Sequence, residues 1–180
     1  MKVPMILALF GVGLMAQAVS LFPDLSVFRV EKAAREIRIW SKNDCRANFF
    51  SAPDQTLIKN VEIRAEDDAL VIDTEKAFQA GVSNLNFNFN ISNPDDRRMG
   101  EKELTVMLSG PKGATVRLFF EGYTVKDQHF ARYQEVELNG EKQIFSFQNN
   151  FADDMKSLHL RFDVKQGGIY KFYAVDYETK

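Results

Sequence analysis

The sequence predicts an all-β fold, a sandwich or a barrel, from three observations. Beyond its first residues the chain is a succession of short segments rich in Phe, Val, Ile or Leu, each bounded by turn residues. Several segments alternate apolar and polar residues, as strands with one buried face do. Helical signals are confined to two short stretches, Glu31–Glu36 and Thr74–Ala80. Many short strands joined by regular turns are typical of an antiparallel sandwich or barrel.

The predicted strands follow one another along the chain, and each has the β-branched and aromatic content that strands favour. In order they are Ser26–Val30, Glu36–Trp40, Leu57–Arg64, Ala69–Thr74, Asn84–Ile91, Glu103–Leu108, Thr115–Tyr123, Tyr133–Leu138, Gln143–Gln148, Ser157–Val164 and Gly168–Glu178. Turns are marked by Asn93-Pro94-Asp95-Asp96, Gly110-Pro111-Lys112-Gly113, Asn139-Gly140 and Gly167-Gly168. Asn139-Gly140 stands between two strand-like segments and predicts a β-hairpin.

The segment Asn84–Ile91 has the clearest alternation, with four Asn residues interleaved with Leu85, Phe87, Phe89 and Ile91. Asn is depleted in strands because its side chain competes for backbone hydrogen bonds, so a row of Asn is an unusual choice for a merely solvated face. Carboxamides both donate and accept hydrogen bonds, as sugar hydroxyls require. A plain solvated surface is the alternative interpretation, and both stay open.

Three further strands are predicted to have one buried face. The apolar sides comprise Val116, Leu118 and Phe120; Leu158, Leu160, Phe162 and Val164; and Leu104, Val106 and Leu108. The opposite sides of the first two strands comprise Arg117, Phe119, Glu121 and Tyr123, and His159, Arg161 and Asp163. Polar residues with a few aromatics would therefore cover the exposed faces.

The first residues predict a secretory signal peptide, residues 1–18. Met1-Lys2 precede an apolar run from Val3 to Met15 and the small-residue site Ala16-Gln17-Ala18. Cleavage would leave residues 19–180 as a single β-sandwich domain, secreted or periplasmic. The alternative is a membrane anchor, but the apolar run is shorter than the roughly 20 residues that span a bilayer. No membrane insertion is expected once the signal is removed.

The composition limits the classes of partner and the covalent links that are expected. The net charge of −2 offers no basic field, so no nucleic-acid partner is expected. Cys45 is the only cysteine, which excludes an intramolecular disulfide; it is interpreted as a partly buried small residue and not as a nucleophile. The sequence leaves the oligomeric state open.

From Asn84 onward the order of elements resembles the carbohydrate-binding modules of the β-jelly-roll type, part of the broader galactose-binding-like group. The resemblance rests on Asn84–Ile91 followed by Glu103–Gly110, on Gln143–Phe147 followed by Leu158–Asp163, and on the closing segment Gly167–Glu178. It covers roughly the last half of the chain. It implies a two-sheet antiparallel β-sandwich of jelly-roll type that binds a poly- or oligosaccharide without cleaving it.

Two positions depart from that family pattern. Many members have a Trp and a Tyr just before the strand that corresponds to Gln143–Gln148, where this chain has Asn139-Gly140-Glu141-Lys142. Members with a structural calcium ion often carry an Asp in the middle of the last strand, where this chain has Tyr173 or Ala174 and then Asp176. If calcium is bound, Asp176 and Glu178 would supply hard oxygen ligands, together with an N-terminal carboxylate or carbonyl.

Sugar binding needs aromatic faces for the C–H patches of a pyranose and planar polar groups for its hydroxyls. The aromatic candidates are Tyr123, Phe119, Tyr133 and Trp40. Trp40 lies either on the face of Arg38 or in the core, depending on register, and core packing is favoured. The polar candidates are Asn86, Asn88, Arg117, Glu121, His159 and Arg161. These residues form one patch only if their three strands share a sheet. Taken singly, Arg117 and Arg161 favour solvated cross-strand ion pairs, and His159 a surface residue.

Catalysis has little support in the sequence. Metalloprotease, serine-hydrolase and phosphate-loop motifs are missing, and His129 and His159 lie far apart in the chain. Asp67-Asp68, Asp95-Asp96 and Asp153-Asp154 are interpreted as solvated loop charges before calcium loops. Two alternatives to a binding module stay open: a secreted structural or protein-interaction sandwich of the cell envelope, and a small glycan-active enzyme using two convergent carboxylates.

Overall fold

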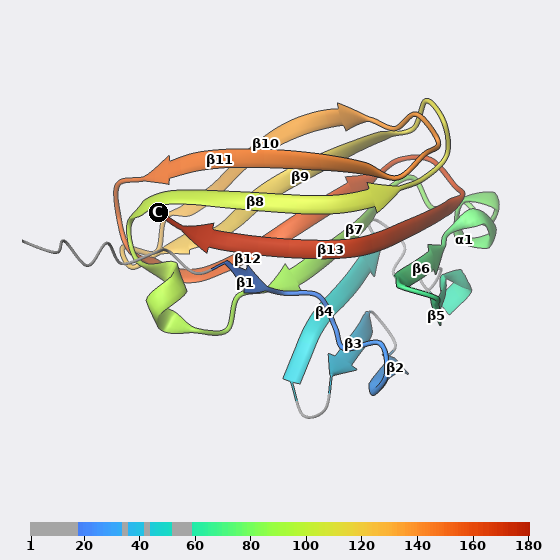
Figure 1. The fold of residues 1–180 in the computed structure, drawn as a ribbon, viewed down its shortest axis with the longest axis horizontal. Helices are drawn as coiled ribbons and strands as arrows, with labels where there is room; N and C mark the ends of the chain where they lie inside the picture. The colour runs from blue at the N-terminus through green and yellow to red at the C-terminus, as the bar shows by residue number, and fades with distance from the viewer. Residues whose placement is uncertain (1–17, 34–35, 42–43, 52–58) are drawn as a thin grey trace, which may run out of the picture.

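Two antiparallel sheets packed against each other make up the fold (Figure 1). The computed structural model describes residues 18–33, 36–41, 44–51 and 59–180. The six-stranded sheet has the order β11 (Gln143–Phe151), β8 (Gly100–Ser109), β13 (Ile169–Thr179), β6 (Ala69–Asp73) and β5 (Glu62–Glu66), with β1 (Val19–Ser20) also paired to β13. The seven-stranded sheet has the order β10 (His129–Glu137), β9 (Thr115–Thr124), β12 (Met155–Val164), β7 (Leu85–Asn90), β4 (Asp44–Ser51), β3 (Ile37–Ser41) and β2 (Phe28–Lys32). The predicted all-β, two-sheet sandwich is confirmed.

The chain crosses between the sheets repeatedly after β7, as in a jelly roll. Strands β7, β9, β10 and β12 belong to the seven-stranded sheet, whereas β8, β11 and β13 belong to the other. The hairpin predicted at Asn139-Gly140 is therefore wrong, because these residues connect β10 to β11 across the two sheets. An Asn-Gly pair allows the positive φ of a tight turn, and Gly140 has φ +96°, but a tight turn alone does not decide which strands pair.

The core lies between the inner faces of the sheets, and the predicted apolar faces are confirmed. Buried on the three predicted strands are Val116, Leu118 and Phe120, then Leu158, Leu160, Phe162 and Val164, then Leu104, Val106 and Leu108. Phe87 and Phe89 are buried as well, and their rings meet Phe172 of the opposite sheet at centroid distances of 6.2 and 5.7 Å. This inner packing forces the alternate residues of the same strands outward.

Some element bounds differ from the prediction. Strand β4 was not expected, and β10 begins at His129, before the predicted start at Tyr133. The turn predicted at Glu31–Glu36 is wrong at its start, because Glu31 and Lys32 belong to β2. The predicted strand Leu57–Arg64 begins outside the described residues, and its later part overlaps β5. The predicted signal peptide, except Ala18, and the Cys45 side chain also lie outside what the structure describes.

Two short helices in the described chain, an α-helix and a 3₁₀ helix, lie in connections between strands. The helix α1 (Glu75–Gln79) confirms the turn predicted at Thr74–Ala80. Before it, the buried Thr74 hydroxyl donates to the Gly168 carbonyl at 2.9 Å and accepts from the Gly168 amide at 3.1 Å, which ties α1 to the start of β13. A 3₁₀ helix, Pro94–Arg97, links β7 to β8. In the described part of the chain, neither helix has the length or apolar character needed to cross a membrane.

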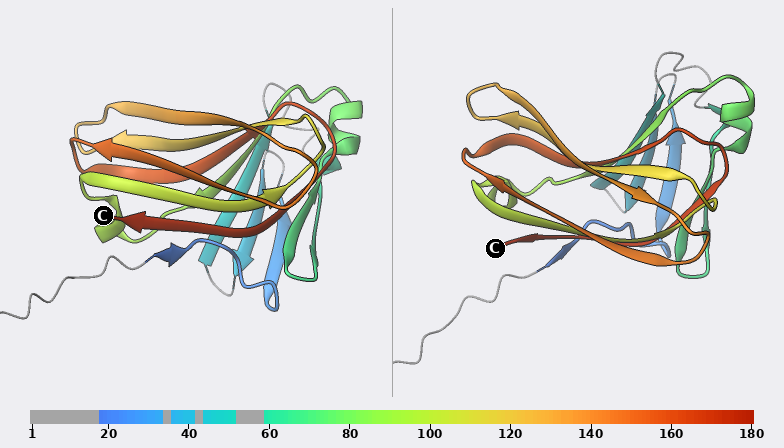
Figure 2. Two further views of the ribbon diagram at one scale, coloured as in Figure 1. Left: turned by 45° about the horizontal axis from the view of Figure 1, so that its top comes forward. Right: turned by 90° about the horizontal axis from the view of Figure 1, so that it is seen from above.

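The seven-stranded sheet is curved. Seen from above, its strands bend so that the outer face lies on the inside of the curve, between the β9–β10 turn at one end and strands β3 and β4 at the other (Figure 2). Side chains that point away from the core on this sheet are therefore drawn toward one another.

Candidate functional site

The residues predicted to form a ligand-binding patch lie together on the outer face of the seven-stranded sheet. Because β12 runs between β7 and β9, His159 lies opposite Asn90 and Glu121. Arg161 likewise lies opposite Asn88 and Phe119. The face comprises Asn86, Asn88 and Asn90 on β7, His159, Arg161 and Asp163 on β12, Arg117, Phe119, Glu121 and Tyr123 on β9, and His129, Tyr133 and Glu135 on β10. We call it the polar face.

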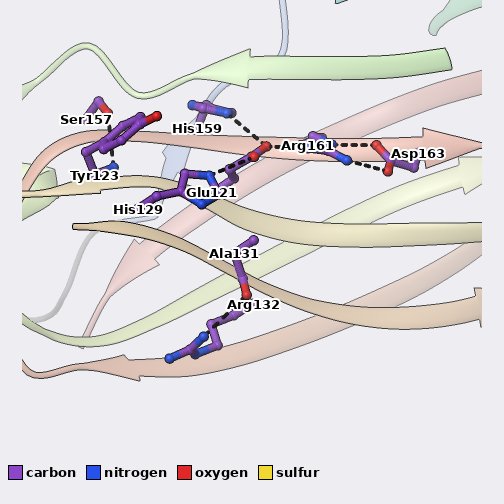
Figure 3. A network of polar contacts seen from close by, with 9 residues as sticks. All are labelled: Glu121, Tyr123, His129, Ala131, Arg132, Ser157, His159, Arg161 and Asp163. Carbon is purple, nitrogen blue, oxygen red and sulfur yellow. Dashed lines mark hydrogen bonds and ion pairs between the residues drawn. The ribbon is translucent and has the colours of Figure 1, made fainter. Parts of the chain in front are cut away.

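Glu121 is the centre of a network on the polar face, shown in Figure 3. Its carboxylate meets the Nε2 atoms of His129 at 3.1 Å and His159 at 3.4 Å, and it accepts from Nη1 of Arg161 at 2.8 Å. The histidines come from β10 and β12, on either side of β9. Two histidines that are remote in sequence therefore meet at one carboxylate.

The electrostatics of Glu121 follow from these contacts. Hydrogen bonds from His159 and Arg161 lower the pKa of Glu121 to about 2, against the partial burial that raises it. The hydrogen bonds that Arg161 donates to Asp163 and Glu121 raise its pKa, although burial opposes this. The carboxylate is thus an ionised acceptor, fixed in place for a hydroxyl donor.

Arg117 and Arg161 have different surroundings. Arg117 pairs with Glu135 on the neighbouring strand at 2.7 Å, which confirms the predicted cross-strand pair. Arg161 also makes the predicted cross-strand pair, with Glu121 of β9 at 2.8 Å, but it has a second partner that was not predicted, Asp163 on its own strand, which is only 5% exposed. Alternation puts residues two apart on one face, so Arg161 reaches both Asp163 and Glu121.

Aromatic side chains line the same face. The rings of Phe119 and Tyr133 lie 5.0 Å apart, and Arg161 lies over Phe119 at 4.6 Å. Arg117 lies over Tyr133 at 5.3 Å. Tyr123 and Tyr133 are 48% and 54% exposed, so each presents a ring to solvent. Phe119 is buried beneath its neighbours and serves to position them.

Asn88 is less accessible than its predicted role implies, with only 7% of its surface exposed. It lies opposite Asn48 of β4, and neither carboxamide oxygen has a hydrogen-bond partner in the described residues. Asn86 is half-buried and accepts from the Asn84 amide at 2.7 Å. The Asn row therefore contains acceptors without donors in the middle of the sheet.

The core interpretation of Trp40 is wrong. Trp40 is half-buried, and its Nε1 donates to Glu31 at 3.0 Å while Arg29 lies over its ring at 5.0 Å. Arg29 and Glu31 alternate with Phe28 and Val30, which pack on the core, so Trp40 lies on the outer side of β3. All four aromatic candidates therefore share the outer face of one sheet.

The polar face is hollowed at both ends. A pocket of about 280 Å³ at one end is lined by Arg117, Glu135, Asp163 and Lys165. A pocket of about 420 Å³ at the other end is lined by Tyr123, Asp127, Lys156 and Ser157. The Glu121 network lies on the strands between them, so an extended ligand is better matched to this face than a compact one.

The two predicted calcium ligands lie elsewhere. Asp176 and Glu178 are on β13 of the six-stranded sheet, and Glu178 lies opposite Glu103 of β8. Glu103 is paired with Lys180 at 2.5 Å. Among the residues that the structure describes, no group of three or more His, Cys, Asp or Glu side chains is arranged to hold a metal ion. The described donors do not make a complete calcium site, and the calcium ion stays a prediction.

Sequence reasoning missed several residues of this face. His129 was overlooked because the turn residues Asp127 and Gln128 hide the start of β10, although the alternation continues back from Tyr133 through Ala131 to His129. Asn48 was overlooked because β4 begins with Asp44 and includes Asn, both of which are depleted in strands. Extending the period of two beyond the strongest apolar residues would have found His129.

Comparison with known proteins gives a likeness of fold. No family model matches the chain, and no curated protein matches it in sequence. Among solved structures, a mutant of a family 29 carbohydrate-binding module has a TM-score of 0.54 at 10% identity, over 92% of this chain and 87% of that one. The CBM22-1 xylan-binding domain of Paenibacillus barcinonensis Xyn10C has a TM-score of 0.51 at 10% identity, over 91% and 92%.

A third similar structure contains the CBM22-1 and GH10 modules of Clostridium thermocellum xylanase 10B in complex with xylohexaose. Its TM-score is 0.53 at 9% identity, over 68% of this chain. This chain spans only a quarter of that protein, 25% of its length. At such low identities the likeness concerns the fold alone: the chain has the β-sandwich fold that these carbohydrate-binding modules have.

Proposed function

We propose that the protein is a non-catalytic carbohydrate-binding module whose site is the polar face. The observation that carries the proposal is the convergence of the Glu121 network with the exposed rings of Tyr123 and Tyr133 on one curved sheet. Exposed rings cover the C–H surface of a pyranose, and fixed carboxylates and imidazoles pair with its hydroxyls. The fold shared with carbohydrate-binding modules supports this ligand class.

The state of the carboxylates argues for binding and against hydrolysis. A glycosidase needs one carboxylic acid whose pKa is raised so that it can donate a proton. The pKa of Glu121 is lowered instead, and Asp163 is held by two nitrogens of Arg161. Both carboxylates are therefore suited to accepting hydrogen bonds. Neither is suited to act as the general acid that the alternative of a glycan-active enzyme requires.

The signal-like N-terminus supports a place of action outside the cytoplasm, secreted or periplasmic, where poly- and oligosaccharides of walls and matrices are found. The proposed partner is an oligosaccharide long enough to run along the face between its two hollows. The sequence and the site chemistry give no reason to expect nucleic acid.

A glycan array tests the proposal, run once with calcium and once with a chelator. Binding to a related set of glycans is the expected result, and a loss with chelator would add the predicted calcium ion. A blank array, with the domain shown to be folded by circular dichroism, would contradict the proposal. The interpretation would then move to a secreted structural or protein-interaction sandwich.

A further inference from the structure

A third pocket lies at the edge of the sandwich, away from the centre of the polar face. It encloses about 280 Å³ between β10 and β11. Strand β10 ends the seven-stranded sheet and β11 ends the six-stranded sheet, so both are edge strands here. We call it the edge pocket and define it by Gln128, Phe130, Arg132, Asn149, Asn150 and Phe151.

The inner side of the edge pocket is aromatic. The rings of Phe130 and Phe151 lie 5.1 Å apart, and Phe151 also meets Phe120 edge-on at 5.7 Å. Phe130 is buried, whereas Phe151 is half-buried. The core therefore fixes the Phe151 ring while part of it stays open to the pocket, as an aromatic platform for a sugar ring requires.

Among the residues that the structure describes, the polar side chains of the edge pocket have almost no partners. Arg132 makes one long contact, at 3.4 Å, with the carbonyl of its neighbour Ala131. Within the described chain, the side-chain amides of Gln128, Asn149 and Asn150 make no hydrogen bond. In Figure 3 the Arg132 guanidinium points away from Glu121 and its partners. This differs from the polar face, where Arg117 and Arg161 are both paired with carboxylates.

The charge balance of the edge pocket is positive. The one carboxylate at its rim, Asp153, is paired with Lys126 at 2.6 Å. His129, also at the rim, contacts the Glu121 carboxylate through Nε2 at 3.1 Å. Arg132 is therefore an unmatched guanidinium beside three unmatched carboxamides, and a guanidinium is best matched by the two oxygens of a carboxylate.

We propose that the edge pocket binds a single uronic acid unit of a saccharide, with Arg132 pairing the carboxylate, the carboxamides pairing the hydroxyls and Phe151 covering the C–H face. Its volume of about 280 Å³ is just below the roughly 300–1,000 Å³ of pockets for drug-sized ligands, which suits one ring. A neutral sugar leaves Arg132 unmatched, and a peptide carboxyl terminus leaves the carboxamides without hydroxyls. The proposal does not rest on the function of the polar face.

Nuclear magnetic resonance titration of the ¹⁵N-labelled protein tests this, with methyl β-D-glucuronide and its neutral counterpart methyl β-D-glucoside as probes. The side-chain amide signals of Gln128, Asn149 and Asn150 report the site. The glucuronide is expected to shift these signals and to bind about tenfold more tightly than the glucoside. Arg132→Gln should lower the glucuronide affinity about tenfold, to the level of the glucoside.

Lys112→Gln is the matched control, because Lys112 is an exposed cation in the β8–β9 turn that lines neither the edge pocket nor the two hollows of the polar face. It should leave the glucuronide affinity unchanged. Equal affinity for the two probes, no shift of the three amide signals, or an equal effect of both substitutions would overturn the proposal. If Arg132→Gln does not fold, two other measurements test the proposal. They are the glucuronide affinity of Arg132→Lys and the preference of the unaltered protein for the glucuronide over the glucoside.

Discussion

The Nε and Nη2 atoms of Arg161 donate to the two carboxylate oxygens of Asp163, at 2.6 and 2.7 Å, within one strand. The remaining terminal nitrogen, Nη1, donates to Glu121 on the neighbouring strand at 2.8 Å. One guanidinium thus neutralises a buried carboxylate and joins it to the centre of the polar face. This pair connects the stability of β12 with the geometry of the proposed site.

Arg161→Ala should destabilise the protein by about 3 kcal/mol, because it leaves Asp163 buried without its cation. Urea denaturation at pH 7 measures the effect. Arg117→Ala is the matched control: its partner Glu135 is exposed, so its removal should cost less than about 1 kcal/mol. Similar losses for both variants would mean that Asp163 finds another donor.

Glu121→Gln should reduce the amount by which the free energy of unfolding falls as the pH is lowered. The folded-state pKa of Glu121, about 2, lies below its ordinary value of 4.5, so its contribution is complete above about pH 4.5 and is lost as the pH falls toward 2. The contribution is on the order of 2 kcal/mol, since one pKa unit equals about 1.4 kcal/mol and the carboxylate is only partly buried. Thermal unfolding from pH 2 to 7 measures it.

The exposed Glu137 at the end of β10 gives the control for that experiment. Glu137→Gln should leave the acid limb of the stability curve as it is in the unaltered protein. A Glu121→Gln variant whose acid limb also stays unchanged would show that other carboxylates govern acid unfolding.

Tyr123→Ala should weaken binding to any glycan found on the array about tenfold, because an exposed stacking ring is lost, while the melting temperature stays nearly the same. Isothermal titration and a thermal melt separate the two effects. Tyr173→Ala, on β13 of the other sheet, is the matched control and should retain full affinity. Unchanged affinity in Tyr123→Ala would move the site away from this end of the polar face.

Some features of the polar face follow from the sequence of single strands, and others depend on how the strands pair. The alternation of β7, β9 and β12 predicted which residues point outward, because a period of two is a local property of a strand. The sequence did not predict that β12 lies between β7 and β9, since strand order depends on pairing between remote segments. Asn139-Gly140 illustrates the limit: the turn chemistry was right, and the partners of β10 and β11 were wrong.

Lys102 lies just before the predicted strand Glu103–Leu108, and the structure places it on the buried side of β8, although lysine is rarely buried without a carboxylate. Its Nζ donates to the Thr179 hydroxyl at 2.9 Å and lies 5.9 Å from the Tyr177 ring. Burial lowers the pKa of Lys102, against the attraction of Asp96 and Asp154. The unfolded chain then holds this proton at pH values where the folded chain has released it, so stability should rise as the pH increases toward 10.5.

Lys102→Met should therefore raise the free energy of unfolding at pH 7 by about 1 kcal/mol and remove the rise at alkaline pH. Denaturant titrations at pH 7 and pH 10 measure both effects. Lys112→Met, at an exposed position in the β8–β9 turn, should change neither. A destabilised Lys102→Met variant would show that the contacts with Thr179 and Tyr177 outweigh the cost of burying the ammonium group.

Gly122→Ala tests how closely β9 and β12 must approach beneath the polar face. A Cβ at Gly122 would overlap the backbone carbonyl of Ser157, at the irregularity of β12 between Met155 and Ser157. The next residue, Tyr123, donates its amide to the Ser157 hydroxyl at 3.2 Å, so the strands cannot separate without moving the exposed ring. The expected loss of stability is about 3 kcal/mol.

Gly113→Ala separates this steric effect from backbone strain. Gly113 has φ +80° and open space where a Cβ would lie, so alanine there should cost only about 1 kcal/mol. Denaturant titration of both variants gives the comparison, and equal losses would mean that β12 can shift to admit a methyl group. A Gly122→Ala variant that folds but binds glycans weakly, while Gly113→Ala binds normally, would show that the position of Tyr123 on the polar face depends on the close approach of β9 and β12 at Gly122.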